Sequence, residues 1–348
     1  MQFEQWDRLR PIGLTPPVMQ ALAALDARGE PMRVTEVHRD RVVLADGESE
    51  SAAQLLPVVR RERPPLAVGD WVAAERDAHG TLWVCERLPP TNQLVRRSSE
   101  GHPQPLVSNV DTALLVMGLD GDFNLRRLER YLAMVTPAGL WPVVVLTKAD
   151  LAGDADARRD EVARRIGAHI DVHAVNALDP SSAAALAPYL GAGQTLVLLG
   201  SSGAGKSTLT NALIGSAVQD TGAVRADDSR GRHTTTTRSL HRLPGGACVI
   251  DTPGLRGLAP DIDEAGLAAS FEDIQSLAAQ CRFRDCTHAD EPGCAVRAGV
   301  APDRLANYQK LLRDIRRETL TPLQKREMVS MWKARGKAAA ARMKMKRG

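Results

Sequence analysis

The 348 residues of the chain are 43% hydrophobic and 25% charged, which is typical of a folded protein with roughly two or three domains. No apolar stretch approaches the roughly 18–20 residues that a membrane helix needs, and the first residues lack the basic and apolar segments of a secretory signal. We therefore expect a cytoplasmic protein with no membrane partner.

The net charge of +3 conceals an uneven distribution of charged residues. From Arg304 to the C-terminus the chain holds 14 Lys/Arg and 3 Asp/Glu, whereas the preceding residues hold 31 Lys/Arg and 39 Asp/Glu. A basic tail on an otherwise acidic chain indicates a polyanionic partner, and a solvated helix end is the alternative interpretation.

The N-terminal part of the chain predicts a small β-barrel behind a helical extension. The extension covers residues 1–31, where an Ala- and Leu-rich stretch at 17–28 is weakly helical. Residues 32–100 contain short β-branched runs separated by turns, at 34–37, 41–44, 68–72 and 81–85. Such closely spaced short strands favour an OB-like barrel, and an SH3-like barrel fits the pattern nearly as well.

The sequence pattern changes after a polar stretch at 96–104, and residues 101–261 are predicted to form an α/β domain. Helical stretches, such as 124–134 and 157–166, separate most of the compact apolar runs, so we expect a mainly parallel sheet. The predicted strands are 112–117, 141–146, 170–174, 195–199 and 247–250. The rest of the chain, 262–348, is predicted to be mainly helical around a cluster of cysteines.

The most specific motif follows the apolar run at 195–199. It matches G-x-x-x-x-G-K-[ST] between a predicted strand and a predicted helix, and its residues are Gly200, Ser201, Ser202, Gly203, Ala204, Gly205, Lys206, Ser207 and Thr208. Its glycines let backbone amides converge on phosphate oxygens, and the helix N-terminus adds a partial positive charge. Lys206 is expected to reach the β- and γ-phosphates and Ser207 to bind Mg²⁺, so the motif predicts a nucleotide site.

Two later segments complete the predicted magnesium site. Asp251, at the end of the last predicted strand, is expected to hold Mg²⁺, and the Gly254 amide to meet the γ-phosphate. A loop rich in threonine lies between the phosphate loop and Asp251, at 234–237. One of these four threonines is expected to complete the Mg²⁺ coordination, and Thr235 is our candidate among them. An ordinary β-rich segment is the alternative interpretation of this threonine run.

A motif resembling N-K-x-D predicts guanine selection. It consists of Thr147, Lys148, Ala149 and Asp150. We expect Asp150 to bind the N1–H and N2–H₂ groups of guanine while the stem of Lys148 packs on the ring. Asn176 and Ala177 follow the next predicted strand and are expected to supply a backbone amide to guanine O6.

The order of these motifs is unusual. Conventional GTPases place the phosphate loop first and the guanine motif later, whereas here the guanine motifs come first. The same sheet with its connectivity cut elsewhere is a circular permutation, and it leaves the D-x-x-G strand directly before the C-terminal domain. We expect switch movement to pass straight into that domain.

The cysteines indicate a metal site. Five cysteines in a chain without a secretory signal argue against a disulfide framework. Three of them lie with a histidine in a C-x4-C-x-H-x5-C pattern, formed by Cys281, Cys286, His288 and Cys294. This ligand set favours tetrahedral Zn²⁺, and with no position left for water the site is structural. Cysteines buried in a helical core are the alternative interpretation of this cluster. Cys85 and Cys248 lie in predicted strands, and we interpret them as core residues.

Together these features resemble the ribosome small-subunit-dependent GTPase A family (RsgA, also called YjeQ). The segments 109–111, 123–125 and 231–236 are similar to it as well, and the resemblance covers about residues 32–320. It implies a multidomain monomer: an N-terminal OB-like β-barrel, a central circularly permuted α/β P-loop GTPase domain and a C-terminal mainly α-helical zinc-binding domain.

The resemblance also implies a function. It implies GTP hydrolysis to GDP and phosphate late in maturation of the small ribosomal subunit, stimulated by that subunit. It implies that the barrel and the zinc domain contact ribosomal RNA, and that one structural Zn²⁺ and a nucleotide-bound Mg²⁺ are the cofactors. Because aromatic residues make up only 3% of the chain, we expect recognition of RNA shape and backbone.

The chain departs from the family pattern at two positions. Thr147 replaces the usual Asn, although its hydroxyl is able to tie the guanine loop to the phosphate loop. Leu255 follows Gly254, where Ras-like enzymes carry a Gln that orients water, and an apolar residue cannot do so. The resemblance therefore favours His233 as a catalytic residue beside Lys206; RNA contact or loop packing is the alternative role for His233.

Two other functions compete with the assembly-factor GTPase. One is a non-catalytic GTP-binding RNA-binding or scaffold protein of ribosome assembly, in which turnover is incidental; Leu255 favours it. The other is a GTPase of tRNA modification or membrane traffic, which the absence of lipidation signals and the flanking barrel and zinc pattern disfavour.

Overall fold

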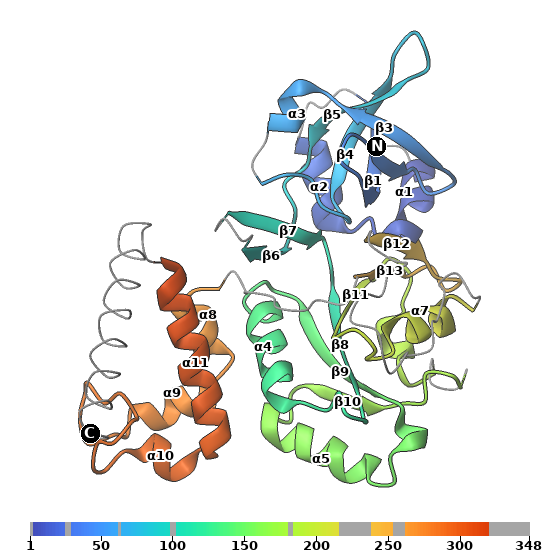
Figure 1. Ribbon diagram of the computed structural model, residues 1–348. Coiled ribbons are helices and arrows are strands. Elements are labelled where there is room, and N and C mark those ends of the chain that lie inside the picture. The colour runs from blue at the N-terminus through green and yellow to red at the C-terminus, as the bar shows by residue number, and fades with distance from the viewer. Residues whose placement is uncertain are drawn as a thin grey trace, which may run out of the picture. The chain divides into compact units, whose positions relative to one another are not determined.

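The computed structural model describes residues 3–24, 29–61, 64–97, 102–179, 184–215, 238–252 and 262–319 (Figure 1). The chain divides into two compact units, residues 1–261 and 262–348. Among the helices that the structure describes, none combines the length and apolar character needed to cross a membrane.

The N-terminal segment is helical and packs into the first unit. It consists of α1 (Phe3–Leu9), the 3-10 turn η1 (Arg10–Ile12) and α2 (Pro16–Ala24). Helix α2 confirms the helix predicted at 17–28 as far as residue 24, and residues 25–28 lie outside the described residues. Helix α1 was not predicted. Leu9, Ile12 and Leu14 are almost fully buried in the main core, so this segment is part of the folded unit.

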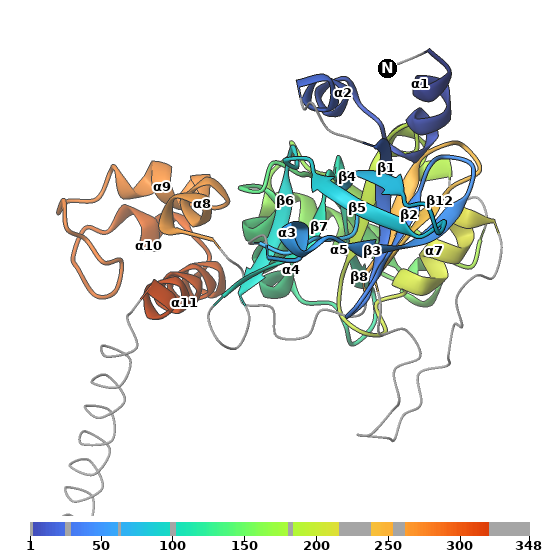
Figure 2. The ribbon, with the colours of Figure 1, turned by 90° about the horizontal axis from the view of Figure 1, so that it is seen from above.

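A five-stranded barrel follows, as Figure 2 shows from above. Its elements are β1 (Glu30–Val37), β2 (Val42–Ala45), β3 (Glu50–Leu55), α3 (Pro57–Arg61), β4 (Trp71–Arg76) and β5 (Leu82–Arg87). The strands are ordered β1-β2-β3-β5-β4, and a β1–β4 pairing closes the barrel. Only β3 and β5 run parallel among these pairs. This is an OB-like five-stranded barrel, and alternate inward residues such as Val34, Val42 and Val84 form its core.

A short two-stranded sheet separates the barrel from the α/β sheet in sequence. It pairs β6 (Gln93–Arg97) with β7 (Pro103–Ser108) in antiparallel register. Arg96 Nε and Nη2 donate to Gln104 Oε1 at 3.0 and 2.7 Å. The polar stretch at 96–104, where the sequence suggested only a change of pattern, therefore contributes residues to both strands.

In the described residues, the α/β sheet contains the five strands predicted from apolar runs and one further strand. Its strands are β8 (Thr112–Gly118), β9 (Trp141–Thr147), β10 (Asp171–Ala174), β11 (Thr195–Leu199), β12 (Ser239–Arg242) and β13 (Cys248–Asp251). Their order is β10-β9-β8-β11-β13-β12, and only β12 runs antiparallel to its neighbour within this group. The strand before the phosphate loop, β11, is central although it follows β8, β9 and β10 in sequence, as the permuted order predicts.

Helices cover both faces of this sheet. α4 (Leu125–Val135) and α5 (Ala155–Ile166) contribute to one core and α7 (Lys206–Ile214) to the other. Alternate residues of β11 divide between the two: Val197 belongs to the first and Leu198 to the second. A strand buried on both faces needs apolar residues at every position, which is why β8, β9 and β11 were visible as continuous apolar runs.

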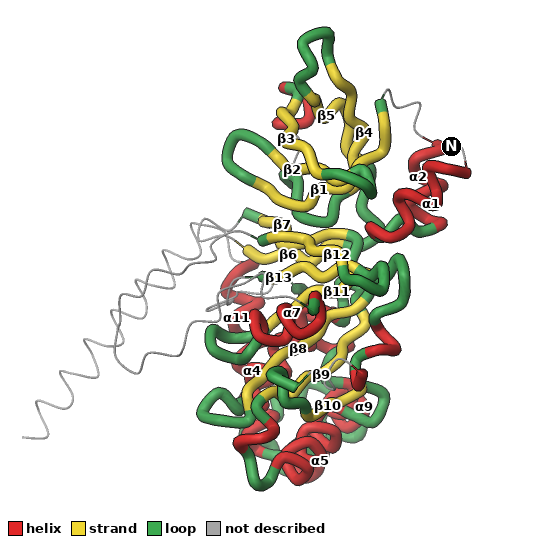
Figure 3. The backbone as a smooth tube through the Cα atoms, turned by 90° about the vertical axis from the view of Figure 1, so that its right-hand side faces the viewer, coloured by secondary structure: helices red, strands yellow, loops and turns green. Residues whose placement is uncertain are grey.

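The barrel and the α/β sheet form one continuous sheet, whose strands follow one another in Figure 3. Strand β12 pairs with β13 on one side and with barrel strand β1 on the other, where Glu36 lies opposite Ser239. The first half of β1 uses the same edge to pair with β4, from Glu30 to Arg33. One edge of β1 is thus shared between the barrel and the α/β sheet.

A fully buried arginine fastens the same junction. Arg33 Nη1 donates to Ile12 O at 2.5 Å and to Thr195 Oγ1 at 2.9 Å, and its Nη2 donates to Asn109 O at 2.8 Å. Burial lowers the pKa of Arg33, and the nearby Asp111 carboxylate acts in the opposite direction. The guanidinium therefore joins the N-terminal segment, the barrel and β11 through hydrogen bonds.

The second unit is helical in its described part. It contains α8 (Glu264–Ala269), α9 (Glu272–Ala278), α10 (Ala295–Gly299) and α11 (Pro302–Thr319). Arg304 on α11 donates to both carboxylate oxygens of Asp273 on α9, at 2.8 and 2.7 Å, and stacks over Phe271 at 4.6 Å. Most of the predicted basic tail, from residue 320 onward, lies outside the described residues.

Candidate functional site

The predicted phosphate loop lies between the end of β11 and the start of α7. Gly203 and Gly205 adopt positive φ angles of 82° and 90°, which favour glycine. At Gly200 a Cβ would lie 2.4 Å from Val116 O on the neighbouring strand β8, so no larger residue fits there without displacement of the backbone. The glycines of the motif thus serve both the tight turn and the close approach to β8.

The lysine of the motif folds back over its own loop. Lys206 Nζ donates to Gly200 O at 3.0 Å and to Ser201 O at 2.8 Å, and the side chain is 7% exposed. Burial lowers the pKa of Lys206, and the carboxylates of Asp251 and Asp122 oppose this shift. The ammonium group therefore lies in a partly desolvated site with two carboxylates in its electrostatic surroundings.

The predicted magnesium ligands approach this loop from a neighbouring strand. Asp251 ends β13 opposite Leu198 on β11, and it is almost fully buried. The next residue, Thr252, donates its hydroxyl to Leu198 O at 2.6 Å and so fixes the chain beside the phosphate loop. Ser207 is half-buried in the first turn of α7. Three predicted site residues lie outside the described residues: His233, Thr235 and Gly254.

The predicted guanine motif is fastened directly to the phosphate loop. Thr147, which is fully buried, donates its hydroxyl to Ala204 O at 2.6 Å. Lys148 adopts a left-handed backbone conformation, with φ of 61°, and its Nζ donates to Gly203 O at 2.8 Å. The Thr147 hydroxyl also lies 3.1 Å from where a Cβ of Gly205 would be. The threonine that replaces the usual Asn therefore ties the two loops together.

The second guanine segment lies beside the first. Ala149 N donates to Val175 O at 3.2 Å, which joins the loop after β9 to the loop after β10. Asn176 turns the chain, because its side-chain oxygen accepts from the backbone amide two residues later at 3.0 Å. Ala177 is buried and Asp150 is exposed at this edge of the sheet. The structure thus brings together all four residues of the first motif and both residues of the second.

Two acidic residues that the sequence analysis did not single out also reach this site. Asp120 and Asp122 lie in the loop between β8 and α4. Asp120 Oδ2 accepts from Lys148 Nζ at 2.6 Å, and Asp122 Oδ1 accepts from the Ser201 hydroxyl at 2.5 Å. Burial acts to raise the pKa of Asp120, but the hydrogen bond and charge of Lys148 hold it below its ordinary value. The signal was present, because both residues follow the carboxyl end of a buried parallel strand.

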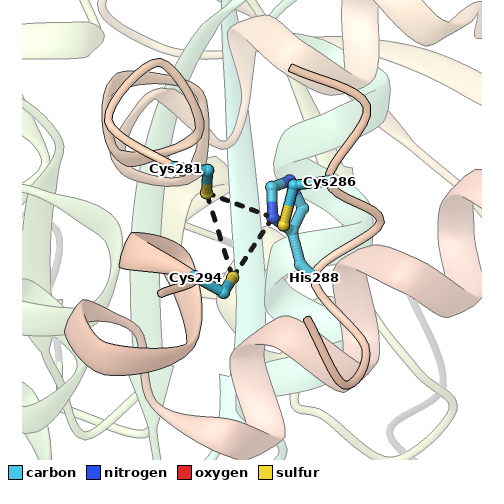
Figure 4. Close-up of side chains that lie close together, drawn as sticks. All are labelled: Cys281, Cys286, His288 and Cys294. Atoms are coloured by element: carbon cyan, nitrogen blue, oxygen red, sulfur yellow. Dashed lines mark hydrogen bonds between the residues drawn. The ribbon is translucent and has the colours of Figure 1, made fainter. Parts of the chain in front are cut away.

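The four predicted zinc ligands converge in the second unit (Figure 4). Their donor atoms all lie within 4.8 Å of one another. The Sγ atoms of Cys281 and Cys294 are 3.9 Å apart, and they lie 3.7 and 3.5 Å from His288 Nδ1. Around a tetrahedral Zn²⁺ with ordinary bond lengths, these separations are about 3.8 Å for S···S and about 3.6 Å for S···N. Three of the four donor atoms therefore lie at the separations of a tetrahedral metal site, and the Cys286 sulfur lies within 4.8 Å of them.

Local structure explains how these side chains meet. Cys294 caps the N-terminus of α10, where the Arg297 amide donates to its sulfur at 3.4 Å. His288 takes a left-handed backbone conformation, with φ of 59°, and Gln309 on α11 donates to its carbonyl oxygen at 3.1 Å. The backbone amide of Val296 is the largest influence that lowers the pKa of Cys281. Amides that stabilise thiolates are a regular outer shell of cysteine-bound metals.

Comparison with known proteins gives consistent results. The family model described as RsgA GTPase matches residues 87–260. A protein of Xanthomonas campestris pv. campestris strain B100, named small ribosomal subunit biogenesis GTPase RsgA, is 50% identical over 311 residues, covering 85% of this chain and 83% of that protein. A protein of the same name from Xanthomonas axonopodis pv. citri is 49% identical over 312 residues, covering 85% and 84%.

Two solved structures are similar to this fold. The crystal structure of YjeQ from Thermotoga maritima matches with a TM-score of 0.60 and 26% identity, covering 82% of this chain and 98% of that one. The crystal structure of YloQ, described as a circularly permuted GTPase, matches with a TM-score of 0.57 and 25% identity, covering 84% and 96%.

Proposed function

The chain belongs to the RsgA GTPase family, and from this premise we propose that it binds the small ribosomal subunit and acts in its late maturation, hydrolysing GTP to GDP and phosphate with stimulation by the subunit. The observation that carries the proposal is the physical link between two motifs. Thr147 and Lys148 of the guanine motif bind the carbonyls of Ala204 and Gly203 in the phosphate loop. Base selection and phosphate binding therefore belong to one site.

Each motif has a part in holding the nucleotide. Asp150, exposed at the sheet edge, would accept hydrogen bonds from the guanine base, and the stem of Lys148 would pack against the ring. Lys206 would exchange its contacts with loop carbonyls for phosphate oxygens, whose negative charge compensates the cost of burying the ammonium group. The proposed nucleotide contacts are residues 147–150, 176–177, 200–208 and Gly254.

The residues present fit a magnesium ion carried with the nucleotide. Asp251 is a buried carboxylate at the end of the strand beside the phosphate loop, and Ser207 presents a hydroxyl from the first turn of α7. Such hard oxygen donors suit Mg²⁺, which supplies charge neutralisation at the β- and γ-phosphates when bound. We propose Thr235 as a further ligand and His233 as the group that orients the attacking water.

The donor set in the second unit fits Zn²⁺ as a structural ion. Cys281, Cys286, His288 and Cys294 offer three sulfurs and one nitrogen within 4.8 Å of one another, and the separations among Cys281, His288 and Cys294 are those of a tetrahedral site. They join the loop after α9 to the start of α10, so the bound ion would fix the fold of this short-helix unit. We propose that this unit, the barrel and the basic tail contact ribosomal RNA, and that the protein acts as a monomer.

The test is GTP turnover by the purified protein, alone and with small subunits, large subunits or bulk RNA. Stimulation by small subunits alone is the expected result. A rate that does not respond to small subunits would support the alternative, a GTP-binding scaffold protein, for which Leu255 in the position of the water-orienting Gln is the favouring observation. His233→Ala is expected to remove the stimulated rate and to leave GTP affinity intact.

A further inference from the structure

The loop between β8 and α4, Leu119 to Asn124, lies at the carboxyl end of the strand next to β11. Ligands of open α/β sheets bind at this edge, outside the carboxyl ends of the strands. The loop carries two carboxylates, and both are hydrogen-bonded to residues of the proposed nucleotide site. Neither carboxylate belongs to a motif that accounts for nucleotide binding.

Asp122 forms the first of these connections. Its Oδ1 accepts from the Ser201 hydroxyl at 2.5 Å and from Arg127 Nη2 at 2.6 Å, while its Oδ2 accepts from Gly118 N at 3.2 Å. Arg127 also donates to the backbone carbonyl of Asp122. The carboxylate is thus held by the Gly118 amide and by Arg127 of α4, and the oxygen that binds Arg127 also accepts from Ser201, the second residue of the phosphate loop.

Asp120 forms the second connection. Its Oδ2 accepts from Lys148 Nζ at 2.6 Å, and its Oδ1 accepts from the amide of Asp122 at 3.0 Å. The same ammonium group donates to Gly203 O at 2.8 Å. Lys148 is therefore held at its tip by two contacts, which restricts the conformations open to the aliphatic stem that would pack against the base.

We propose that Asp120 and Asp122 are positioning residues for the nucleotide: Asp122 sets the phosphate loop through Ser201, and Asp120 sets the base-stacking lysine. This inference rests on the proposed nucleotide site. Contacts to Ser201, Gly203 and Ala204 then come from three side chains on two other loops, which leaves little freedom in the outer part of the phosphate loop. Preorganisation of this kind raises affinity because fewer conformations are lost on binding.

The two carboxylates have different expected signatures. Asp120→Asn removes a charge-assisted hydrogen bond, so it should weaken GTP and GDP binding about tenfold while kcat at saturation stays within about twofold, because the base contact is the same before and during reaction. Asp122→Asn should weaken both nucleotides by a similar factor. If Asp122 acts through Ser201, the double variant Asp122→Asn/Ser201→Ala should bind no more weakly than Asp122→Asn alone.

The experiment titrates the full-length protein with fluorescent GDP and GTP analogues and measures urea unfolding of every variant. Asp263→Asn is the matched control, because this carboxylate caps α8 in the second unit and Asn caps helices equally well. Unchanged binding by Asp120→Asn and Asp122→Asn would mean that these carboxylates do not position the nucleotide site, and tighter binding would mean that they only repel phosphate. Either result would overturn the inference. Additive losses in the Asp122 and Ser201 pair would overturn the positioning role of Asp122.

A further variant separates this inference from the proposed site. Lys206→Ala should abolish nucleotide binding without loss of fold. If it binds normally, the proposed site is wrong and the inference fails with it. If it abolishes binding while both aspartate variants bind as the wild type does, the proposed site stands and only the positioning role is refuted.

Discussion

Thr147→Val tests whether the guanine motif and the phosphate loop act as one site. Valine has the shape of threonine without the hydroxyl, and Thr147 is fully buried, so the substitution removes one hydrogen bond and leaves the packing intact. The Ala204 carbonyl then loses the donor that lies 2.6 Å away. Leaving a buried acceptor without its donor costs about 1–3 kcal/mol.

If that energy is lost from the nucleotide-binding form of the loop, GDP affinity should fall by about five- to 150-fold, since 1.4 kcal/mol corresponds to a factor of ten. The assay is equilibrium titration with a fluorescent GDP analogue. Thr147→Ser keeps the hydroxyl and serves as the matched control, which should bind within about threefold of the wild type. Equal affinity for Thr147→Val and Thr147→Ser would refute the link between the two loops.

Three other changes have defined outcomes. Arg33→Met removes all donors of a fully buried guanidinium and should lower the free energy of unfolding in urea by about 3–5 kcal/mol, whereas exposed Arg76→Met should change it by under about 0.5 kcal/mol. Chelation of the metal, or Cys281→Ser, should reduce helical circular dichroism of the second unit; an unchanged spectrum would contradict a structural ion. Burial acts to raise the pKa of Asp273, but Arg304 holds this pKa below its ordinary value. The ion pair therefore stabilises the second unit above about pH 4, and this stabilisation is lost as the pH falls further. Asp273→Asn should reduce the pH dependence of stability in acid unfolding curves.

Predictions from the sequence agree best with the structure where the residues of a feature lie close together in the chain. The strand at 195–199 and the phosphate loop lie together in sequence, so pattern and structure agree there. The hydroxyl of Thr147 also ties the loops as the sequence suggested, although its partner is 57 residues away. Asp122 was missed although it follows the carboxyl end of a buried strand, because its link to Ser201 spans 79 residues and no known motif includes it.

Two of the strands that were missed, β3 and β12, share a physical cause. β3 has the sequence Glu-Ser-Ala-Ala-Gln-Leu and β12 has Ser-Leu-His-Arg, so neither carries the apolar alternation or β-branched residues that mark a strand. Their conformation is imposed by pairing with neighbours: β3 lies between β2 and β5, and β12 lies between β13 and β1. Tertiary pairing of this kind overrides weak local preference, and one chain read alone does not reveal it.

The sharing of the β1 edge sets a limit on how this protein can be divided. A fragment that begins after the barrel would leave β12 with one open edge, and open strand edges pair with those of other chains. The barrel alone would lose much less, because β2 and β4 still pair with β1 and close it. We therefore expect the α/β part expressed by itself to aggregate and the barrel expressed by itself to stay monomeric. The solubility of the α/β part thus depends on the barrel, and the solubility of the barrel does not depend on the α/β part.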